Sequence, residues 1–246
     1  MRVAGVRVDC DHRLAIGLEL VPGKLAEDVL LHLALGDAPP AAERAALHRL
    51  AAALRGMSEA MMDTAASEAQ LVAAADGVET ILAVLEAAPR HRALRGFAES
   101  SNSGDSRAMF DSSPLIGLGN PVAPPMRLNV VDDHVEGTAI FGTAYEGPPG
   151  HVHGGFVAAA FDELLGMAQS LTGNPGMTGS LTVRYRKPTP LHRELRFIGR
   201  VDRVEGRKIF TSGSLFAGET LCAEADGLFI SVDFERMRQL AAARPG

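Results

Sequence analysis

The N-terminal part of the chain has the hydrophobic spacing of helices. Between residues 24 and 97, stretches rich in Ala, Leu, Glu and Arg carry apolar side chains at three- and four-residue steps, which places those side chains on one helix face. Gly and Pro residues separate the stretches. The pattern predicts helices over residues 24–35, 41–54, 58–75 and 78–85. Residues 1–98 are therefore interpreted as a helical N-terminal region of unknown role.

A polar stretch without periodicity follows the helical region. From Glu99 to Ser106 the chain contains only Ser, Asn, Gly, Asp and Glu, a composition typical of linkers. We therefore predict a linker over residues 99–109, a second domain over residues 110–236 and a C-terminal tail over residues 237–246.

The second domain has the alternation of strands. In residues 181–186, apolar and polar side chains alternate, which is the period of a sheet with one face in water. Related stretches predict strands over residues 128–131, 135–145, 178–186, 195–204, 208–217 and 220–234. Gly206 and Gly218 lie where tight turns would join the last three strands into an antiparallel meander.

One helix interrupts this series of strands. Residues 155–171 are apolar on most sides, so we expect this helix to be wrapped by the sheet. The predicted fold class is therefore α+β, with a curved antiparallel sheet around one long central helix and a helical region before it.

Composition narrows the classes of function. The 246 residues are 46% hydrophobic and 22% charged, ordinary values for a globular protein with a full core. The net charge of −6 argues against wholesale nucleic-acid binding. No long uncharged apolar run predicts a membrane span, and the first residues lack the apolar core of a secretory signal. Cys10 and Cys222 have no metal-ligand spacing, so a reduced, cytoplasmic setting without a metal is expected.

The start of the predicted central helix carries the candidate chemistry. His153, Gly154 and Gly155 open the helix, and Asp162 follows Gly155 by seven residues, close to two turns, on nearly the same face. Free backbone N–H groups at a helix start can polarise a carbonyl, and a carboxylate can act as base or nucleophile. This combination suits attack on an acyl group.

Several motifs of the second domain form a set. They are Glu146-Gly-Pro-Pro-Gly150, His153-Gly154-Gly155, Asp162 nine positions after His153, and the stretches at residues 181–188 and 204–208. With them, about residues 110–236 resemble the hotdog-fold acyl-CoA thioesterases, in particular the PaaI-like group and its eukaryotic relatives in the thioesterase superfamily. His-Gly-Gly alone is common; the nine-residue spacing inside a strand–helix–strand order makes the motif specific.

The resemblance implies hydrolysis of an acyl-CoA thioester to a free acid and CoA. The thioester carbonyl would accept a hydrogen bond from the N–H of Gly154 or Gly155, and such preorganised donors stabilise a developing oxyanion. Asp162 would act as general base or as nucleophile, and in the family this carboxylate comes from the opposing subunit. We therefore expect a homodimer or a dimer of dimers with the site at the subunit interface. Coenzyme A enters as part of the substrate, and no separate cofactor is implied.

The resemblance also implies supporting roles. His153 would orient the thioester or fix the loop before the helix. The family places a hydroxyl in the strand after the helix to position water, and both Thr178 and Ser180 are candidates. Loop capping by His153 and plain strand positions for the two hydroxyl residues are the structural alternatives.

The phosphates of coenzyme A are anionic, so we expect basic side chains to bind them. Five candidates lie on predicted strand or turn surface: Arg184, Arg186, Lys187, Arg207 and Lys208. The alternative is a solvated face, the common setting of Lys and Arg.

Two other classes of function fit parts of the pattern. Hotdog domains can bind acyl-CoA without catalysis, as sensors that are sometimes joined to a DNA-binding helical segment. Residues 1–106 hold 10 Lys and Arg against 15 Asp and Glu, a net charge of −5, which has the wrong sign for phosphate binding. The presence of Asp162 also favours a catalytic domain over a non-catalytic sensor. Hotdog hydratases pair an Asp with a His a few residues later, and no His follows Asp162 until His192.

The helical region could cap the acyl tunnel, mediate oligomerisation or dock a partner. The helices over residues 41–54 and 58–75 are amphipathic, and packing against each other is the simplest arrangement. Residues 107–246 are expected to fold alone as a dimer.

Overall fold

The computed structural model describes residues 7–8, 14–15, 42–88, 111–124, 126–174 and 176–232. Its first elements are two-residue strands, β1 (Arg7–Val8) and β2 (Leu14–Ala15), which pair antiparallel. The helix predicted over residues 24–35, the linker over 99–109 and the tail over 237–246 lie outside the described residues.

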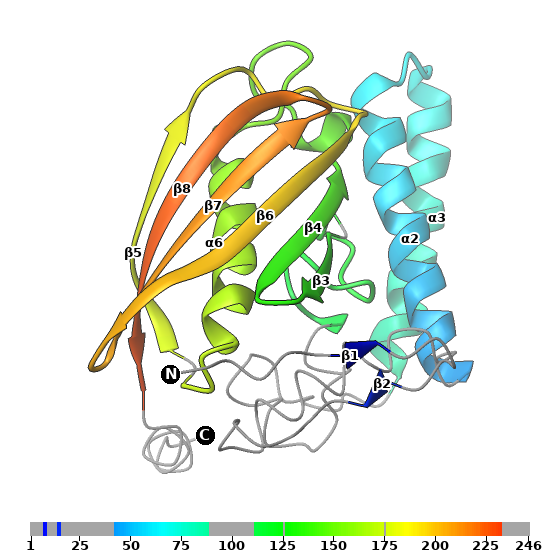
Figure 1. The fold of residues 1–246 in the computed structure, drawn as a ribbon. Helices are drawn as coiled ribbons and strands as arrows, with labels where there is room; N and C mark the ends of the chain where they lie inside the picture. Colours follow the sequence, from blue (N-terminus) through cyan, green and yellow to red (C-terminus); the bar gives the residue numbers. More distant parts are fainter. Residues whose placement is uncertain are drawn as a thin grey trace.

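A six-stranded antiparallel sheet dominates the C-terminal part of the chain (Figure 1). Its strands are β3 (Arg127–Val131), β4 (His134–Ile140), β5 (Gly176–Tyr185), β6 (Glu194–Glu205), β7 (Lys208–Ala217) and β8 (Thr220–Ser231). They lie side by side in the order β3-β4-β6-β7-β8-β5. The sheet curves around helix α6 (Gly154–Ser170). This confirms the predicted α+β fold, and β6 to β8 form the expected meander.

Close packing between α6 and the sheet forms the core. Phe161, Leu164 and Leu165 of α6 are completely buried, and each side chain of this size contributes about 2 kcal/mol through burial. Gly199 of β6 pairs with Gly213 of β7, and a Cβ on Gly199 would lie only 2.8 Å from Leu164 Cγ. Because real Cβ atoms do not approach so closely, glycine lets the helix lie this near the sheet. The middle of α6 is thereby held close to β6 and β7.

Strand β4 ends earlier than the alternation predicts. The strand expected over residues 135–145 stops at Ile140, and Thr143–Tyr145 form a short 3₁₀ helix, η1, with Gly142 as its N-cap. The N–H of Tyr145 donates to the carbonyl of Gly142 at 3.1 Å, a bond within the turn instead of to a neighbouring strand. The chain therefore leaves the sheet at this point.

The N-terminal helices are longer than their glycines predict. Helices α2 (Ala42–Asp63) and α3 (Glu68–Ala87) run through Gly56 and Gly77, so the boundaries predicted at residues 54–58 and 75–78 are wrong. A single glycine costs a helix about 1 kcal/mol and does not by itself end it. The break lies at residues 64–67, where Ser67 N–H donates to Gln70 Oε1 at 2.9 Å in a capping box.

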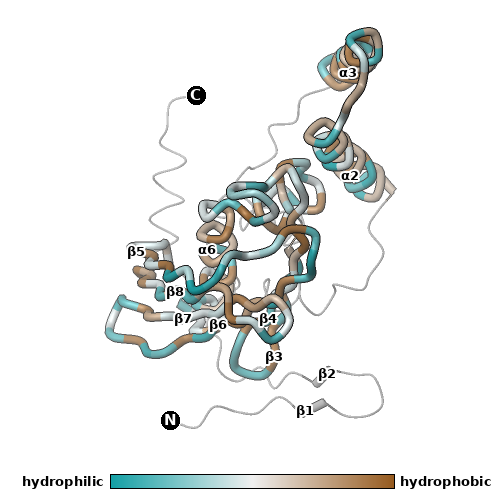
Figure 2. Tube along the Cα trace, turned by 90° about the horizontal axis from the view of Figure 1, so that it is seen from above, coloured by the Kyte–Doolittle hydropathy of each residue, from teal (hydrophilic) through white to brown (hydrophobic). Residues whose placement is uncertain are grey.

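Helix α2 lies against the C-terminal part, and α3 is the outermost helix (Figure 2). One residue of α2, Ala51, is buried at 2% exposure, whereas α3 buries none. Leu71 and Leu85 of α3 are about half exposed. The packing predicted between helices over residues 41–54 and 58–75 does not occur in that form, because residues 58–63 belong to α2 and residues 68–75 to α3. None of the helices in the described ranges is long and apolar enough to cross a membrane.

Candidate active site

The helix start is shaped by His153, the N-cap of α6. Its backbone is extended, and its Nδ1 accepts a hydrogen bond from the N–H of Gly155 at 3.0 Å. A Cβ on Gly155 would lie 3.0 Å from this nitrogen, so glycine makes room for the ring. Because Nδ1 accepts, the proton of the neutral imidazole sits on Nε2. The side chain is exposed, and Nε2 is its available donor.

Gly154 keeps an available donor at the same place. Within the described residues, its N–H donates to no protein acceptor, whereas the N–H of Gly155 is taken by His153. The carbonyl of Gly154 accepts from the Tyr185 hydroxyl at 2.8 Å. Of the two N–H groups that the sequence left as candidates, the one of Gly154 therefore has no hydrogen-bond partner among the described residues, and we call it the open N–H.

Asp162 lies two turns along α6 and is exposed. Its Oδ1 accepts from the Thr178 hydroxyl of β5 at 2.8 Å. A bulge shifts the register of β5 between Thr178 and Ser180. Thr178 pairs with the buried Phe229, whose side chain lies on the face of the sheet that carries α6. Ser180 pairs with Leu228, and neighbouring residues of a strand point to opposite faces, so Ser180 lies on the other face. The structure brings Thr178 to Asp162 and does not bring Ser180 there.

Glu163, beside Asp162, was not singled out by the sequence. Its Oε1 accepts from the Ser113 hydroxyl at 2.6 Å. Burial raises the pKa of the Glu163 carboxyl, the hydrogen bond from Ser113 lowers it, and the charge of Asp162 raises it. Two adjacent carboxyl groups thus have different surroundings, and the exposed one faces the hydroxyl of β5.

Tyr185 was also missed as a site residue. The alternation in β5 identified it only as a strand residue, and no local motif links it to a helix that begins 31 residues earlier. Its contact with Gly154 depends on how β5 passes the start of α6. Such a long-range hydrogen bond has no signature in one sequence.

Three of the basic candidates lie at one end of β5 and just beyond it. This β5 group consists of Arg184, Arg186 and Lys187, all exposed. Arg184 forms an ion pair with Asp226, and Arg186 Nε lies 2.7 Å from Glu224 Oε2. The two arginines therefore already have carboxylate partners on β8.

The other two basic candidates, the turn group, lie at the far end of β8. Arg207 Nε donates to the carbonyl of Ser231 at 3.0 Å, and Lys208 pairs with Ile230. Ile230 lies six positions along β8 from Glu224, which pairs with Arg184 of the β5 group. This is a distance of about 20 Å at the rise of a strand. One protomer therefore does not gather the five residues into one patch.

No group of three or more His, Cys, Asp and Glu side chains that could hold a metal ion occurs in the part of the chain that the structure describes. The expectation that the reaction uses no metal or cofactor stays a prediction.

Residues 149–224, which contain His153 to Thr178, match the family described as the thioesterase superfamily. The chain is 38% identical over 97 residues to acyl-coenzyme A thioesterase THEM4 of Bos taurus, covering 39% of this chain and 40% of that protein. With THEM4 of Mus musculus the identity is 34% over 122 residues, covering 49% of this chain and 52% of that protein. The matches thus span about half or less of these curated relatives.

A solved structure of a thioesterase superfamily protein is similar over a longer stretch. It is 34% identical, with a TM-score of 0.68, and the match covers 78% of this chain and 97% of that one. Residues 110–236 make up only about half of the 246 residues, so this match reaches into the helical region. With this identity over nearly the whole of a solved relative, the chain belongs to the thioesterase superfamily.

Proposed function

We propose that this chain hydrolyses acyl-CoA thioesters to a free acid and coenzyme A. The observation that carries the proposal is the hydrogen bond from Thr178 to Asp162, which holds a carboxylate two turns from the open N–H of Gly154. The similarity to proteins named acyl-coenzyme A thioesterase supports this chemistry.

Gly154 supplies the oxyanion donor in this proposal. Tyr185 binds the oxygen and His153 binds the N–H of the peptide group between Gly154 and Gly155. That peptide is held from both sides, so the preceding N–H keeps its direction as charge develops on the thioester oxygen. In other acyl-transfer enzymes, loss of one such donor lowers kcat about 10²- to 10³-fold.

Asp162 performs the proton or acyl transfer. Thr178 occupies Oδ1, which leaves Oδ2 for the reaction. As a general base, Asp162 takes a proton from the water that attacks the carbonyl carbon; the C–S bond then breaks and the departing thiolate recovers the proton. As a nucleophile, it forms an anhydride with release of the thiolate, and water then hydrolyses the anhydride. Both routes use the same contacts.

The reaction requires two copies of the chain. Gly154 and Asp162 are eight residues apart on one helix, a separation of about 12 Å. A carbonyl bound at the helix start is therefore out of hydrogen-bond reach of Asp162 in the same protomer. A symmetric dimer that places Asp162 of one copy near Gly154 of the other completes two equal sites.

The same pairing would gather the basic residues. The β5 group adjoins Tyr185, which contacts Gly154. The turn group adjoins Thr178, because Thr178 and Lys208 pair with neighbouring residues of β8. A site made of Gly154 from one copy and Asp162 from the other thus brings the β5 group of the first near the turn group of the second, where both can meet the phosphates of coenzyme A.

Thiol release from a panel of acyl-CoA esters tests the proposed function. Wild-type protein should release CoA, and Asp162→Ala should reduce kcat by about 10³-fold or more while its far-UV circular dichroism is unchanged. The panel also ranks acyl chains. Absence of turnover in wild type, with the esters still bound, would replace the proposal with a non-catalytic acyl-CoA sensor.

A further inference from the structure

Helix α2 contacts the C-terminal part through a row of polar side chains. The row consists of Arg44, His48, Arg55, Glu59 and Asp63, which recur along one face of the helix. Ala51, the one buried residue of α2, lies in the middle of this row. The contact is thus specified by polar side chains around a small apolar centre.

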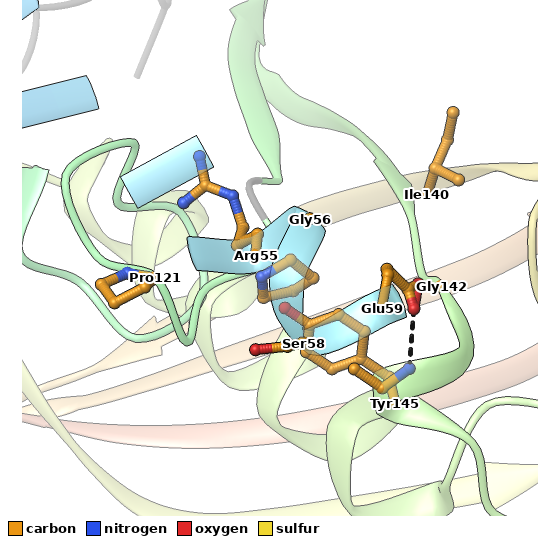
Figure 3. Close-up of a pocket in the computed structure, with 10 residues that line it drawn as sticks. Arg55, Gly56, Ser58, Glu59, Pro121, Ile140, Gly142 and Tyr145 are labelled. Atoms are coloured by element: carbon orange, nitrogen blue, oxygen red, sulfur yellow. Dashed lines mark hydrogen bonds between the residues drawn. The ribbon is translucent and has the colours of Figure 1, made fainter. Parts of the chain in front are cut away.

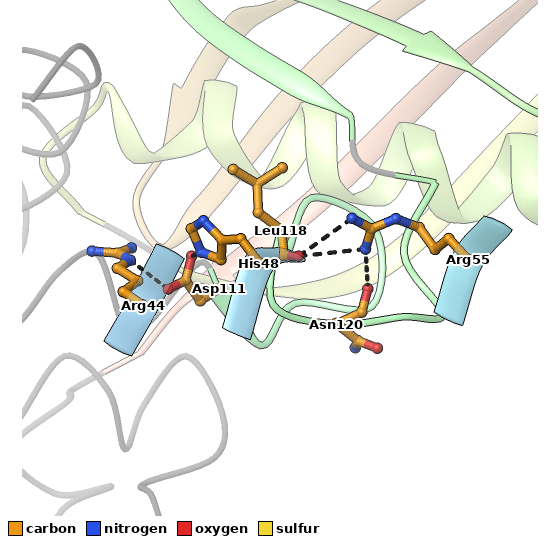
Figure 4. A network of polar contacts seen from close by, with 6 residues as sticks. All are labelled: Arg44, His48, Arg55, Asp111, Leu118 and Asn120. Carbon is orange, nitrogen blue, oxygen red and sulfur yellow. Dashed lines mark hydrogen bonds and ion pairs between the residues drawn. The ribbon is translucent and has the colours of Figure 1, made fainter. Parts of the chain in front are cut away.

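The first half of the row binds the loop before the sheet (Figure 4). Arg44 Nε lies 2.5 Å and His48 Nε2 lies 2.8 Å from the two oxygens of Asp111. One turn beyond Ala51, the guanidinium of Arg55 donates to the carbonyl of Asn120 at 2.8 Å. These contacts hold the helix in a fixed register against the loop.

The second half of the row binds η1, and Figure 3 shows Glu59 beside Gly142 and Tyr145. Glu59 Oε2 accepts from the N–H of Ala144 at 3.0 Å, and Asp63 Oδ2 accepts from the Thr143 hydroxyl at 3.2 Å. The N-cap of η1 is Gly142, which has no side chain that could accept a hydrogen bond. A free backbone N–H in the first turn of η1 therefore needs an acceptor from another part of the chain. Glu59, 85 residues earlier in the chain, supplies that acceptor. Its carboxylate fills the space that a Cβ on Gly142 would need.

The capped turn adjoins the candidate active site. The carbonyl of Tyr145, the last residue of η1, accepts from the N–H of His153 at 2.9 Å. The ring of Tyr145 packs edge-on against the ring of Phe156 of α6, with ring centroids 4.9 Å apart. His153 in turn caps Gly155. A short chain of contacts thus runs from Glu59 through η1 to the helix start.

We propose that Glu59 is a positioning residue for the candidate active site, because it fixes η1 and thereby the His153 cap and the open N–H of Gly154. This inference gives part of the N-terminal region a role in the reaction and rests on the proposed function. Glu59 itself touches no reacting atom.

Steady-state kinetics of variants of the 246-residue chain test the inference. Glu59→Ala removes the acceptor and should lower kcat about 10- to 100-fold with KM nearly unchanged, because the substrate still binds but meets a misplaced donor. Glu59→Gln keeps an acceptor oxygen and should restore kcat to within about threefold of wild type. Glu79→Gln, an exposed change on α3, is the matched control and should behave as wild type. Wild-type kcat in Glu59→Ala would overturn the inference.

Amide hydrogen exchange tests the same inference independently of turnover. In Glu59→Ala, residues 143–157 should exchange faster than in wild type and in Glu59→Gln, while β6 to β8 remain unchanged. Unaltered exchange in residues 143–157, or equally faster exchange throughout the sheet, would contradict a positioning role. If wild-type protein releases no thiol, the proposed function fails, and this exchange pattern still decides whether Glu59 fixes the helix start.

Discussion

The two parts of the molecule are held in place by different interactions. In the C-terminal part, α6 buries large apolar side chains such as Phe161 and Leu164 completely against the sheet. In the N-terminal part, α2 buries only Ala51 and α3 buries nothing, and α2 is held through Glu59 and its polar neighbours.

The comparison shows which kind of interaction determines the arrangement of each part. Apolar burial is repetitive and non-directional, so it can organise a whole domain. Ion pairs and hydrogen bonds contribute less free energy but demand one geometry. The N-terminal helix therefore adds little to the core while fixing the position of a turn beside the candidate site.

The largest expected effect comes from the core. Ile209 of β7 is completely buried, and Ile209→Ala should lower the free energy of unfolding by about 2–5 kcal/mol through lost burial and a cavity. Urea unfolding followed by circular dichroism measures it. A cost under about 1 kcal/mol would mean that the core of the C-terminal part is less tightly packed than the structure shows.

An intermediate effect is expected at the contact between the two parts. Asp111 pairs with both Arg44 and His48, and these side chains are only 13–20% exposed. Asp111→Ala should cost roughly 1–2 kcal/mol, because it leaves Arg44 without its partner. Limited proteolysis should cleave residues 42–88 sooner while the sheet stays intact. Unchanged protease sensitivity would show that other contacts hold α2.

The smallest effect is expected on α3. Ile81 is 44% exposed, so Ile81→Ala should change the free energy of unfolding by less than about 0.5 kcal/mol. It is the same substitution as Ile209→Ala and therefore its matched control in urea unfolding. A loss above about 2 kcal/mol would break the comparison, because it would mean that the apolar side of α3 is covered in solution.

Much of the C-terminal fold could be predicted because its signals are local and periodic. Alternation located five of the six strands to within a few residues, and the apolar run after His153 located α6. The prediction failed at residues 141–145, where the chain leaves the sheet after Ile140 and Thr143–Tyr145 form η1. It also failed at Gly56 and Gly77, although the Ser67–Gln70 capping box marked the real break between the helices.

The sequence predicted only those parts of the candidate site whose residues lie close together along the chain. The helix start and the spacing to Asp162 belong to one helix, so the sequence displays them. The choice of Thr178 over Ser180 depends on a bulge, for which the glycine between them was a weak signal. The contacts of Tyr185 and Glu59 join single polar residues across 31 and 85 positions. Such contacts repeat with no period, so only the structure reveals them.

A mixing experiment with two inactive variants tests the central claim, a site built from Gly154 of one copy and Asp162 of another. Gly154→Pro removes the open N–H at a first helical position that suits proline, and the extended backbone of His153 suits a residue before proline. Gly154→Pro and Asp162→Ala should each release almost no thiol from acyl-CoA. After joint unfolding and refolding, half of the dimers are mixed and each holds one intact site, so about a quarter of wild-type activity should return. A mixture as inactive as its components would contradict the shared site.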